Sequence, residues 1–123
     1  MWYNLTEIFE RDWGTPMRVE VKQFLDEYVS KFNELDTGAN ALVLFGSQAR
    51  NTATISSDID IAVVMNDDLS PRTRGELLSL GDEIDMRFDV NLFFTTQDAL
   101  AAATNDLDTN THIKKEGVVL WQA

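Results

Sequence analysis

The chain of 123 residues contains no cysteine, and this absence excludes disulfides, thiolate nucleophiles and zinc sites built from cysteine. No apolar run approaches the roughly 18 residues that a membrane-spanning helix needs. The N-terminus lacks the basic start and the long apolar stretch of a secretory signal. We therefore expect a cytoplasmic protein that has no membrane contact.

Basic residues are also scarce, with 10 Lys and Arg against 21 Asp and Glu and a net charge of −11. This charge opposes binding to a phosphate backbone, because the affinity for nucleic acid comes largely from Lys and Arg. We expect no direct nucleic-acid binding. An acidic surface instead suits a cationic ligand, a basic protein partner or metal ions.

The composition is that of one folded domain, with 44% hydrophobic and 25% charged residues. No repeat, low-complexity tract or linker divides the chain, so we expect a single domain over residues 1–123. Segment 1–14 is rich in large apolar residues. It either packs on the core or forms a contact surface for another chain.

Helices and strands alternate along the sequence. Thr15-Pro16 and Ser70-Pro71 each pair a capping hydroxyl with a proline suited to the first helical position. They predict one helix that ends near Gly38 and a second that ends near Ile84, followed by a short helix over residues 98–103. Apolar runs predict strands at residues 41–45, 59–65, 88–94 and 118–121. The fold class is α/β (α+β), a small mixed sheet with flanking helices.

A turn suited to anion binding follows the first predicted strand. Gly46 has no Cβ, so backbone amides there can approach a ligand closely. Ser47 can cap a following helix or donate to a phosphate oxygen, and the free N–H groups of such a helix point to the same place. The pattern is not a Walker loop, because no Gly-Lys-Ser/Thr follows at the required spacing.

Acidic residues interrupt the second and third predicted strands. Asp58 and Asp60 are separated by one residue, so their side chains leave the same face of a strand. Asp89 stands where the third strand favours an apolar residue. Carboxylates this close repel unless a divalent cation joins them, and hard oxygen ligands favour Mg²⁺. Three acids beside an anion-binding turn indicate metal-assisted phosphoryl or nucleotidyl transfer.

The order of these residues resembles a known family. Gly46-Ser47, ten further residues, Asp58-Ile59-Asp60 and a later strand acid are similar to the nucleotidyltransferase superfamily of DNA polymerase beta. The resemblance is strongest to the minimal nucleotidyltransferase branch, which tends to close with an Ile-x-x-Glu-Gly-aliphatic segment like the one beginning at Ile113. It covers residues 41–121 and implies the nucleotidyltransferase fold.

The resemblance also implies a role for each site residue. Asp58 and Asp60 would bind the metal ions, and Asp89 would be the third acid, joining the metal shell and helping to deprotonate the acceptor hydroxyl. Gly46 and Ser47 would bind the nucleotide triphosphate. Arg50 matches the Arg of the family's Gly-Ser-x-Ala-Arg-Gly opening and would join the nucleotide site. The glycine that usually follows is Asn51 here.

This resemblance implies a Mg²⁺-dependent enzyme that uses ATP and two metal ions. Related enzymes often hold the acceptor on an additional helical domain, for which 123 residues leave no room, so a homo-oligomer or a second protein would supply that surface. The minimal branch resembles antitoxins that transfer AMP to a tyrosine of a HEPN ribonuclease toxin, and we expect this activity. Two alternatives remain open: a nucleotidyltransferase acting on a small molecule such as an aminoglycoside, and an antitoxin that neutralises its partner by binding alone.

Overall fold

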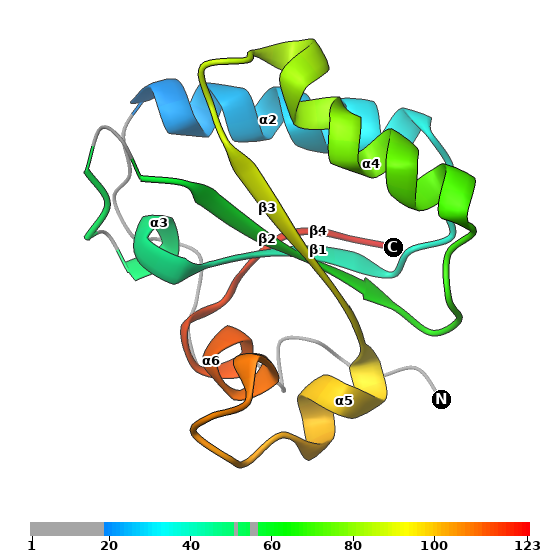
Figure 1. The fold of residues 1–123 in the computed structure, drawn as a ribbon, viewed down its shortest axis with the longest axis vertical. Coiled ribbons are helices and arrows are strands. Elements are labelled where there is room, and N and C mark those ends of the chain that lie inside the picture. Colours follow the sequence, from blue (N-terminus) through cyan, green and yellow to red (C-terminus); the bar gives the residue numbers. More distant parts are fainter. Residues whose placement is uncertain (1–18, 51, 55–56) are drawn as a thin grey trace.

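A computed structural model of the chain describes residues 19–50, 52–54 and 57–123. Its four-stranded sheet has the order β3-β2-β1-β4 (Figure 1). β1 pairs antiparallel with both β2 and β4, whereas β2 pairs parallel with β3. The sheet is therefore mixed, as predicted. Its strands are β1 (Ala41–Phe45), β2 (Ile59–Met65), β3 (Val90–Thr96) and β4 (Val118–Gln122).

Helices cover both faces of this sheet (Figure 1). α2 (Val19–Glu34) and α4 (Pro71–Ile84) lie side by side on one face. α5 (Gln97–Ala102) and α6 (Thr109–Glu116) lie on the other, and the short α3 (Gly46–Arg50) follows β1 directly. This arrangement confirms the predicted α/β class. Within the described ranges, no helix combines the length and apolar character needed to cross a membrane.

The two central strands are buried on both faces, which explains why they read as continuous apolar runs. Alternate residues of each strand contribute to different cores. The core under α2 and α4 includes Leu42, Leu44, Ile59, Ile61 and Val63. The core under α5 and α6 includes Ala41, Val43, Ala62, Val64, Leu100 and Ile113.

The predicted start of α4 is confirmed. The Ser70 hydroxyl accepts a hydrogen bond from the Thr73 N–H, and Pro71 occupies the first helical position. The cap predicted at Thr15-Pro16 and segment 1–14 lie outside the described residues. The helix α6 was not predicted from the sequence. It begins after Asp108, whose side chain accepts a hydrogen bond from the Asn110 N–H.

The third strand begins at Val90, two residues later than predicted. Phe88 is used instead for packing, with its ring centroid 4.8 Å from that of Phe24 in α2. Just before it, the Arg87 guanidinium binds the Asp85 carboxylate at 2.7 Å, in the turn between α4 and β3. The local alternation of apolar residues did not reveal that residue 88 belongs to this turn.

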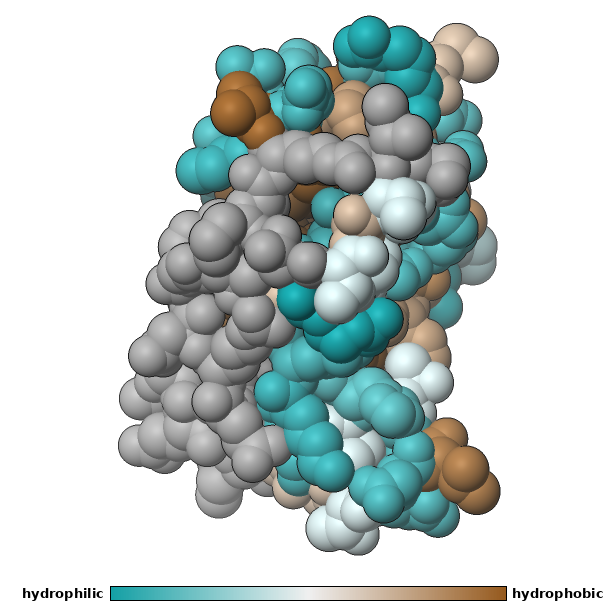
Figure 2. Space-filling view, turned by 90° about the vertical axis from the view of Figure 1, so that its left-hand side faces the viewer, coloured by the Kyte–Doolittle hydropathy of each residue, from teal (hydrophilic) through white to brown (hydrophobic). Residues whose placement is uncertain are grey.

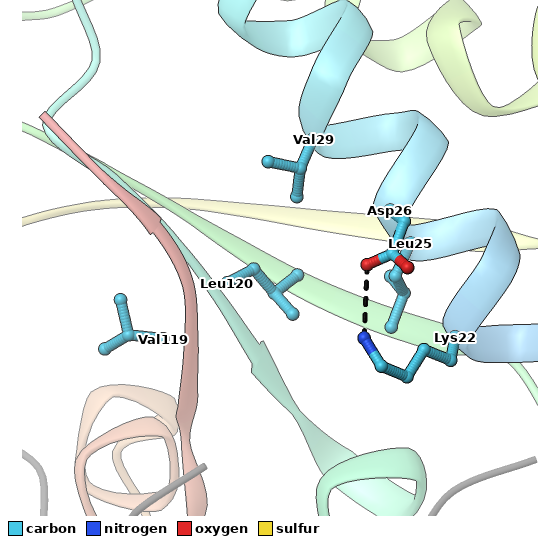
Figure 3. A pocket seen from close by; sticks show the side chains of 6 residues that line it. All are labelled: Lys22, Leu25, Asp26, Val29, Val119 and Leu120. Carbon is cyan, nitrogen blue, oxygen red and sulfur yellow. Dashed lines mark hydrogen bonds and ion pairs between the residues drawn. The ribbon is translucent and has the colours of Figure 1, made fainter.

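A groove of about 300 Å³ lies where α2 passes the edge strand β4 (Figure 3). Leu25, Val29 and Leu120 line it, together with Val119. An ion pair between Lys22 and Asp26 stands at its rim. None of the predicted site residues lines this groove.

Candidate active site

The sheet topology brings the ends of several strands to one place. Phe45, at the end of β1, lies opposite Asp60 near the start of β2. Because β2 and β3 are parallel, Asn91 near the start of β3 lies beside Asp60 as well. β4 begins next to the end of β1, with Val118 opposite Leu44. Residues from four distant parts of the sequence therefore meet at this end of the sheet.

Asp58 and Asp60 are joined there by Asn91. The Asn91 side-chain nitrogen Nδ2 lies 3.0 Å from Asp58 Oδ2 and 3.2 Å from Asp60 Oδ1. A side-chain amide has two N–H donors, so it can donate one hydrogen to each carboxylate. The structure thus brings two of the three predicted acids, Asp58 and Asp60, to one amide group.

Asn91 was not predicted as a site residue. A polar residue between the apolar residues Val90 and Leu92 was a possible signal, since it shares a strand face with the residue two positions earlier. That earlier residue, Asp89, was selected instead. The choice between the two depends on the register of β3 against β2, which places Asn91 beside Asp60.

Asp89 directly precedes β3 and is exposed. Its backbone carbonyl accepts a hydrogen bond of 2.8 Å from the Ile59 N–H, so residue 89 runs alongside the start of β2. In the part of the chain that the structure describes, no three acidic, histidine or cysteine side chains form a group that could hold a metal ion. The role of Asp89 as a third acid stays a prediction.

Gly46 lies directly against the Asp60 carboxylate. Its φ of +75° is in the left-handed region, and a Cβ at this position would overlap Asp60 Oδ2. Only glycine satisfies both requirements at low cost. Ser47 follows in α3, and its carbonyl accepts a hydrogen bond of 3.0 Å from the Thr52 N–H. The predicted nucleotide-binding turn therefore adjoins the predicted metal-binding acids.

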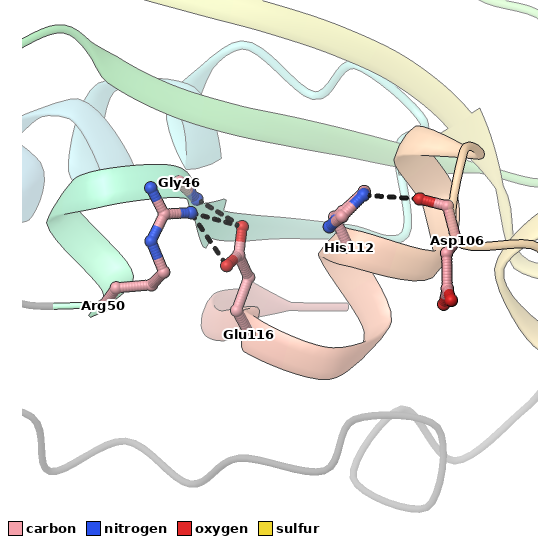
Figure 4. Close-up of polar contacts among 5 residues, drawn as sticks. All are labelled: Gly46, Arg50, Asp106, His112 and Glu116. Carbon is pink, nitrogen blue, oxygen red and sulfur yellow. Dashed lines mark hydrogen bonds and ion pairs between the residues drawn. The ribbon is translucent and has the colours of Figure 1, made fainter.

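Arg50, at the end of α3, reaches Glu116 at the end of α6 (Figure 4). Arg50 Nη1 lies 3.0 Å and 2.9 Å from the two carboxylate oxygens of Glu116. The Gly46 N–H donates to Glu116 Oε1 at 3.1 Å. Glu116 was not selected as a site residue, although it belongs to the quoted Ile-x-x-Glu-Gly segment. On the same helix, the His112 Nε2 atom lies 2.8 Å from the carbonyl oxygen of Asp106.

The donor groups at this end of the sheet suit a hard divalent cation. Asp58 and Asp60 supply carboxylate oxygens, and Asn91 can present its amide oxygen if the side chain turns over. Neither acid takes part in the ion pairs found among the described residues. The carboxylate oxygens of these acids and the amide oxygen fit Mg²⁺.

On the side of the molecule where α3 lies, the described surface that is visible is mostly hydrophilic (Figure 2).

Comparisons with known proteins point to one family. Residues 27–123 match the family described as Polymerase beta, Nucleotidyltransferase. No curated protein sequence matches the chain at a significant level.

Several solved structures have a similar fold. The chain is similar to a toxin–antitoxin structure with AMP-PNP, with 28% identity, a TM-score of 0.56 and coverage of 80% of this chain and 73% of that one. It is similar to the toxin–antitoxin MntA–HepT, with 25% identity, a TM-score of 0.51 and coverage of 83% and 73%. A tri-AMPylated Shewanella oneidensis HEPN toxin in complex with an MNT antitoxin matches at 25% identity, with a TM-score of 0.50 and coverage of 83% and 72%.

The family match covers most of the chain, including the whole sheet and the residues gathered at its end. It agrees with the resemblance that Gly46-Ser47 and Asp58-Ile59-Asp60 carry in the sequence. The chain belongs to the polymerase beta nucleotidyltransferase family.

Proposed function

We propose that this chain is a Mg²⁺-dependent adenylyltransferase that transfers AMP from ATP to a tyrosine hydroxyl of a HEPN toxin and thereby neutralises the toxin. The observation that carries this proposal is the contact of Asn91 with both Asp58 and Asp60, beside a glycine turn against which the Asp60 carboxylate packs. Family membership supports nucleotidyl transfer. The similarity to an MNT antitoxin in complex with a tri-AMPylated HEPN toxin supports the kind of acceptor.

Each site residue has a chemical task in this proposal. Asp58 and Asp60 would hold two Mg²⁺ ions, with Asp89 as the third acid of the metal shell. When bound, the ions would supply positive charge that stabilises the attacking and leaving oxygens. Gly46 lets the backbone lie close to the Asp60 carboxylate. Together with Ser47 and Arg50, it would bind the triphosphate.

The transfer itself forms one bond and breaks another. The tyrosine oxygen would attack the α-phosphorus of ATP, and the bond from that phosphorus to the β-phosphate oxygen would break, so that pyrophosphate leaves. Asp89 would accept the proton of the tyrosine hydroxyl as a general base. In-line positioning of the two reactants contributes much of the catalysis in reactions of this kind.

Charge supports a protein acceptor of this class. The net charge of −11 would steer the chain toward a basic partner, and a ribonuclease needs basic residues where it binds RNA. We place the reaction in the cytoplasm, where ATP is available. A second copy of the chain remains an alternative source of the acceptor surface.

The decisive experiment combines the chain, the protein encoded beside it, Mg²⁺ and ATP labelled at the α-phosphate. We expect label on a tyrosine of the partner. The double variant Asp58→Asn with Asp60→Asn should abolish the transfer. Asp67→Asn with Asp68→Asn is a matched control, since it removes two neighbouring exposed acids beyond the other end of β2 and should leave transfer unchanged.

The same experiment separates the two alternatives. Label on an aminoglycoside in the absence of a protein partner would identify a small-molecule nucleotidyltransferase. A partner that is neutralised equally well by the Asp58→Asn, Asp60→Asn variant would identify an antitoxin that acts by binding alone. No label on any acceptor, from a folded sample with Mg²⁺ present, would contradict the proposed reaction.

A further inference from the structure

Glu116, the last residue of α6, makes its side-chain contacts with a distant segment. Its Oε1 accepts a hydrogen bond from the Gly46 N–H at 3.1 Å, across 70 residues of sequence. Arg50 Nη1 lies 3.0 Å and 2.9 Å from the two carboxylate oxygens of Glu116. Gly46 and Arg50 are the first and last residues of α3. A single carboxylate therefore holds both ends of this short helix (Figure 4).

The position of Glu116 is unfavourable for α6 itself. An acid at the C-terminus of a helix opposes the helix dipole, which favours cations such as the neighbouring Lys114 and Lys115. The Glu116 side chain is also only 16% exposed. A carboxylate buried to this extent needs hydrogen-bond partners and a counter-charge, and α3 provides both. The contacts with α3, and not the stability of α6, therefore explain why residue 116 is an acid.

Gly46 is fixed from two sides by these contacts. Glu116 binds its N–H, and the Asp60 carboxylate fills the volume where its Cβ would be. A shift of Gly46 toward Asp60 is therefore blocked by the carboxylate, and a shift away from Glu116 breaks a charge-assisted hydrogen bond. Arg50 restrains the other end of α3 in the same way.

We propose that Glu116 is a positioning residue for nucleotide binding, which holds Gly46 and Arg50, and through Gly46 the Asp60 carboxylate packed against it, where they would meet the triphosphate. This inference rests on the proposed function, because the triphosphate is the ligand for which the turn is positioned. It assigns the N–H of Gly46 to Glu116. The contribution of Gly46 to the site is then the close approach to the Asp60 carboxylate that its missing side chain allows.

Two variants of Glu116 separate its contacts. Glu116→Gln keeps an oxygen that can accept from the Gly46 N–H but loses the charge that pairs with Arg50. Glu116→Ala loses both contacts. Asp106→Asn is the matched control, since it weakens the 3.2 Å ion pair of Lys115, a residue of the same helix, without touching α3.

The experiment measures the Kd for AMP-PNP with Mg²⁺ by calorimetry, and the hydrogen exchange of the Gly46 amide by NMR. Loss of a charge-assisted hydrogen bond predicts a Kd about tenfold higher or more for Glu116→Ala. The Gly46 amide should exchange faster in the same variant, and Glu116→Gln should show a smaller change in Kd. Asp106→Asn should match the wild type in both measurements.

A purely structural role would lower the Tm of Glu116→Ala but leave the Kd of the folded protein unchanged, and this result would overturn the inference while leaving the proposed function intact. If Glu116→Ala does not fold, Glu116→Gln becomes the test variant. A Kd and a Gly46 amide exchange rate equal to those of the wild type in Glu116→Gln would then overturn the inference. If the wild type itself binds no AMP-PNP, the inference and the proposed function both fail.

Discussion

The backbone of Gly46 lies so close to the Asp60 carboxylate that a Cβ at residue 46 would overlap Asp60 Oδ2. Gly46→Ala should therefore displace Asp60 and reduce nucleotidyl transfer at least about tenfold, because small displacements of reacting groups are costly. Gly38→Ala is the matched control. Gly38 also has a positive φ, of +82°, but a Cβ there would meet no atom within 4 Å.

Both glycine variants should lose about 1–2 kcal/mol in the free energy of unfolding, because each places an alanine at a positive φ. Urea denaturation measures this shared cost, and transfer of labelled AMP measures the effect on the site. Equal transfer activity in the two variants would contradict a specific role for the contact between Gly46 and Asp60.

Asn91→Asp should make the stability of the protein more dependent on Mg²⁺. The substitution replaces the donor shared by Asp58 and Asp60 with a third negative charge. Without metal, the repulsion should lower the Tm, and with Mg²⁺ the added ligand should produce a larger rise in Tm than in the wild type. Asn33→Asp, which adds the same charge on the exposed side of α2, should leave the Mg²⁺ response unchanged. Identical responses from the two variants would argue against Asn91 as part of the metal site.

Mg²⁺ at millimolar concentration should raise the Tm of the wild type, because preferential binding to the folded state stabilises it. Asp60→Asn should weaken this rise, since it removes one of the carboxylates gathered by Asn91. Asp82→Asn, a change of an exposed acid on α4, serves as the control for a general loss of charge. Thermal unfolding with and without MgCl₂ makes the measurement. A rise of equal size in all three proteins would place the bound Mg²⁺ elsewhere.

Arg50→Met and Glu116→Ala should affect AMP-PNP affinity less than additively when combined. The two side chains contact each other, and paired residues in double-mutant cycles show coupling of about 0.5–3 kcal/mol. The cycle is completed by measuring the Kd of the wild type, the two single variants and the double variant. Strictly additive effects would show that Arg50 acts on the nucleotide independently of Glu116.

The stability of the fold should decrease at high pH because of Tyr28. Burial raises the pKa of the Tyr28 phenol above its ordinary value of 10.0. The unfolded chain therefore loses this proton at a lower pH than the folded chain does. The stabilising difference is fully present below pH 10.0 and is lost progressively as the pH rises above that value. Urea denaturation should show a steeper loss in the wild type than in Tyr28→Phe, and parallel pH profiles would refute this assignment.

Some of the geometry at the candidate site follows from local sequence. The alternation of a strand places Asp58 and Asp60 on one face, and their shared contact with Asn91 agrees with that placement. Gly46, directly after β1, was predicted to let backbone amides approach a ligand. The structure gives two other reasons for a glycine there, its positive φ and the Asp60 carboxylate beside it. Ser70-Pro71 likewise predicted the start of α4, because a helix cap depends on residues within one turn of it.

Long-range contacts were not predictable in this way. Asn91 and Asp89 share the alternation of one strand, but only the pairing of β3 with β2 decides that Asn91 lies beside Asp60. The contact of Glu116 with Gly46 spans 70 residues and requires α6 to pack near the end of β1. Phe88 was predicted to lie in a strand, but it precedes β3 and its ring packs on that of Phe24.

The sequence by itself determined the apolar central strands, the alternation of helices and strands, and the order of glycine and acids that identifies the family. Each of these depends on residues close together along the chain, where backbone geometry alone relates one side chain to the next. Only the tertiary structure decided which amide joins the two acids and which carboxylate holds the glycine turn. Strand register and helix docking set those contacts, because they result from the packing of all elements together and leave no periodic pattern in any one of them.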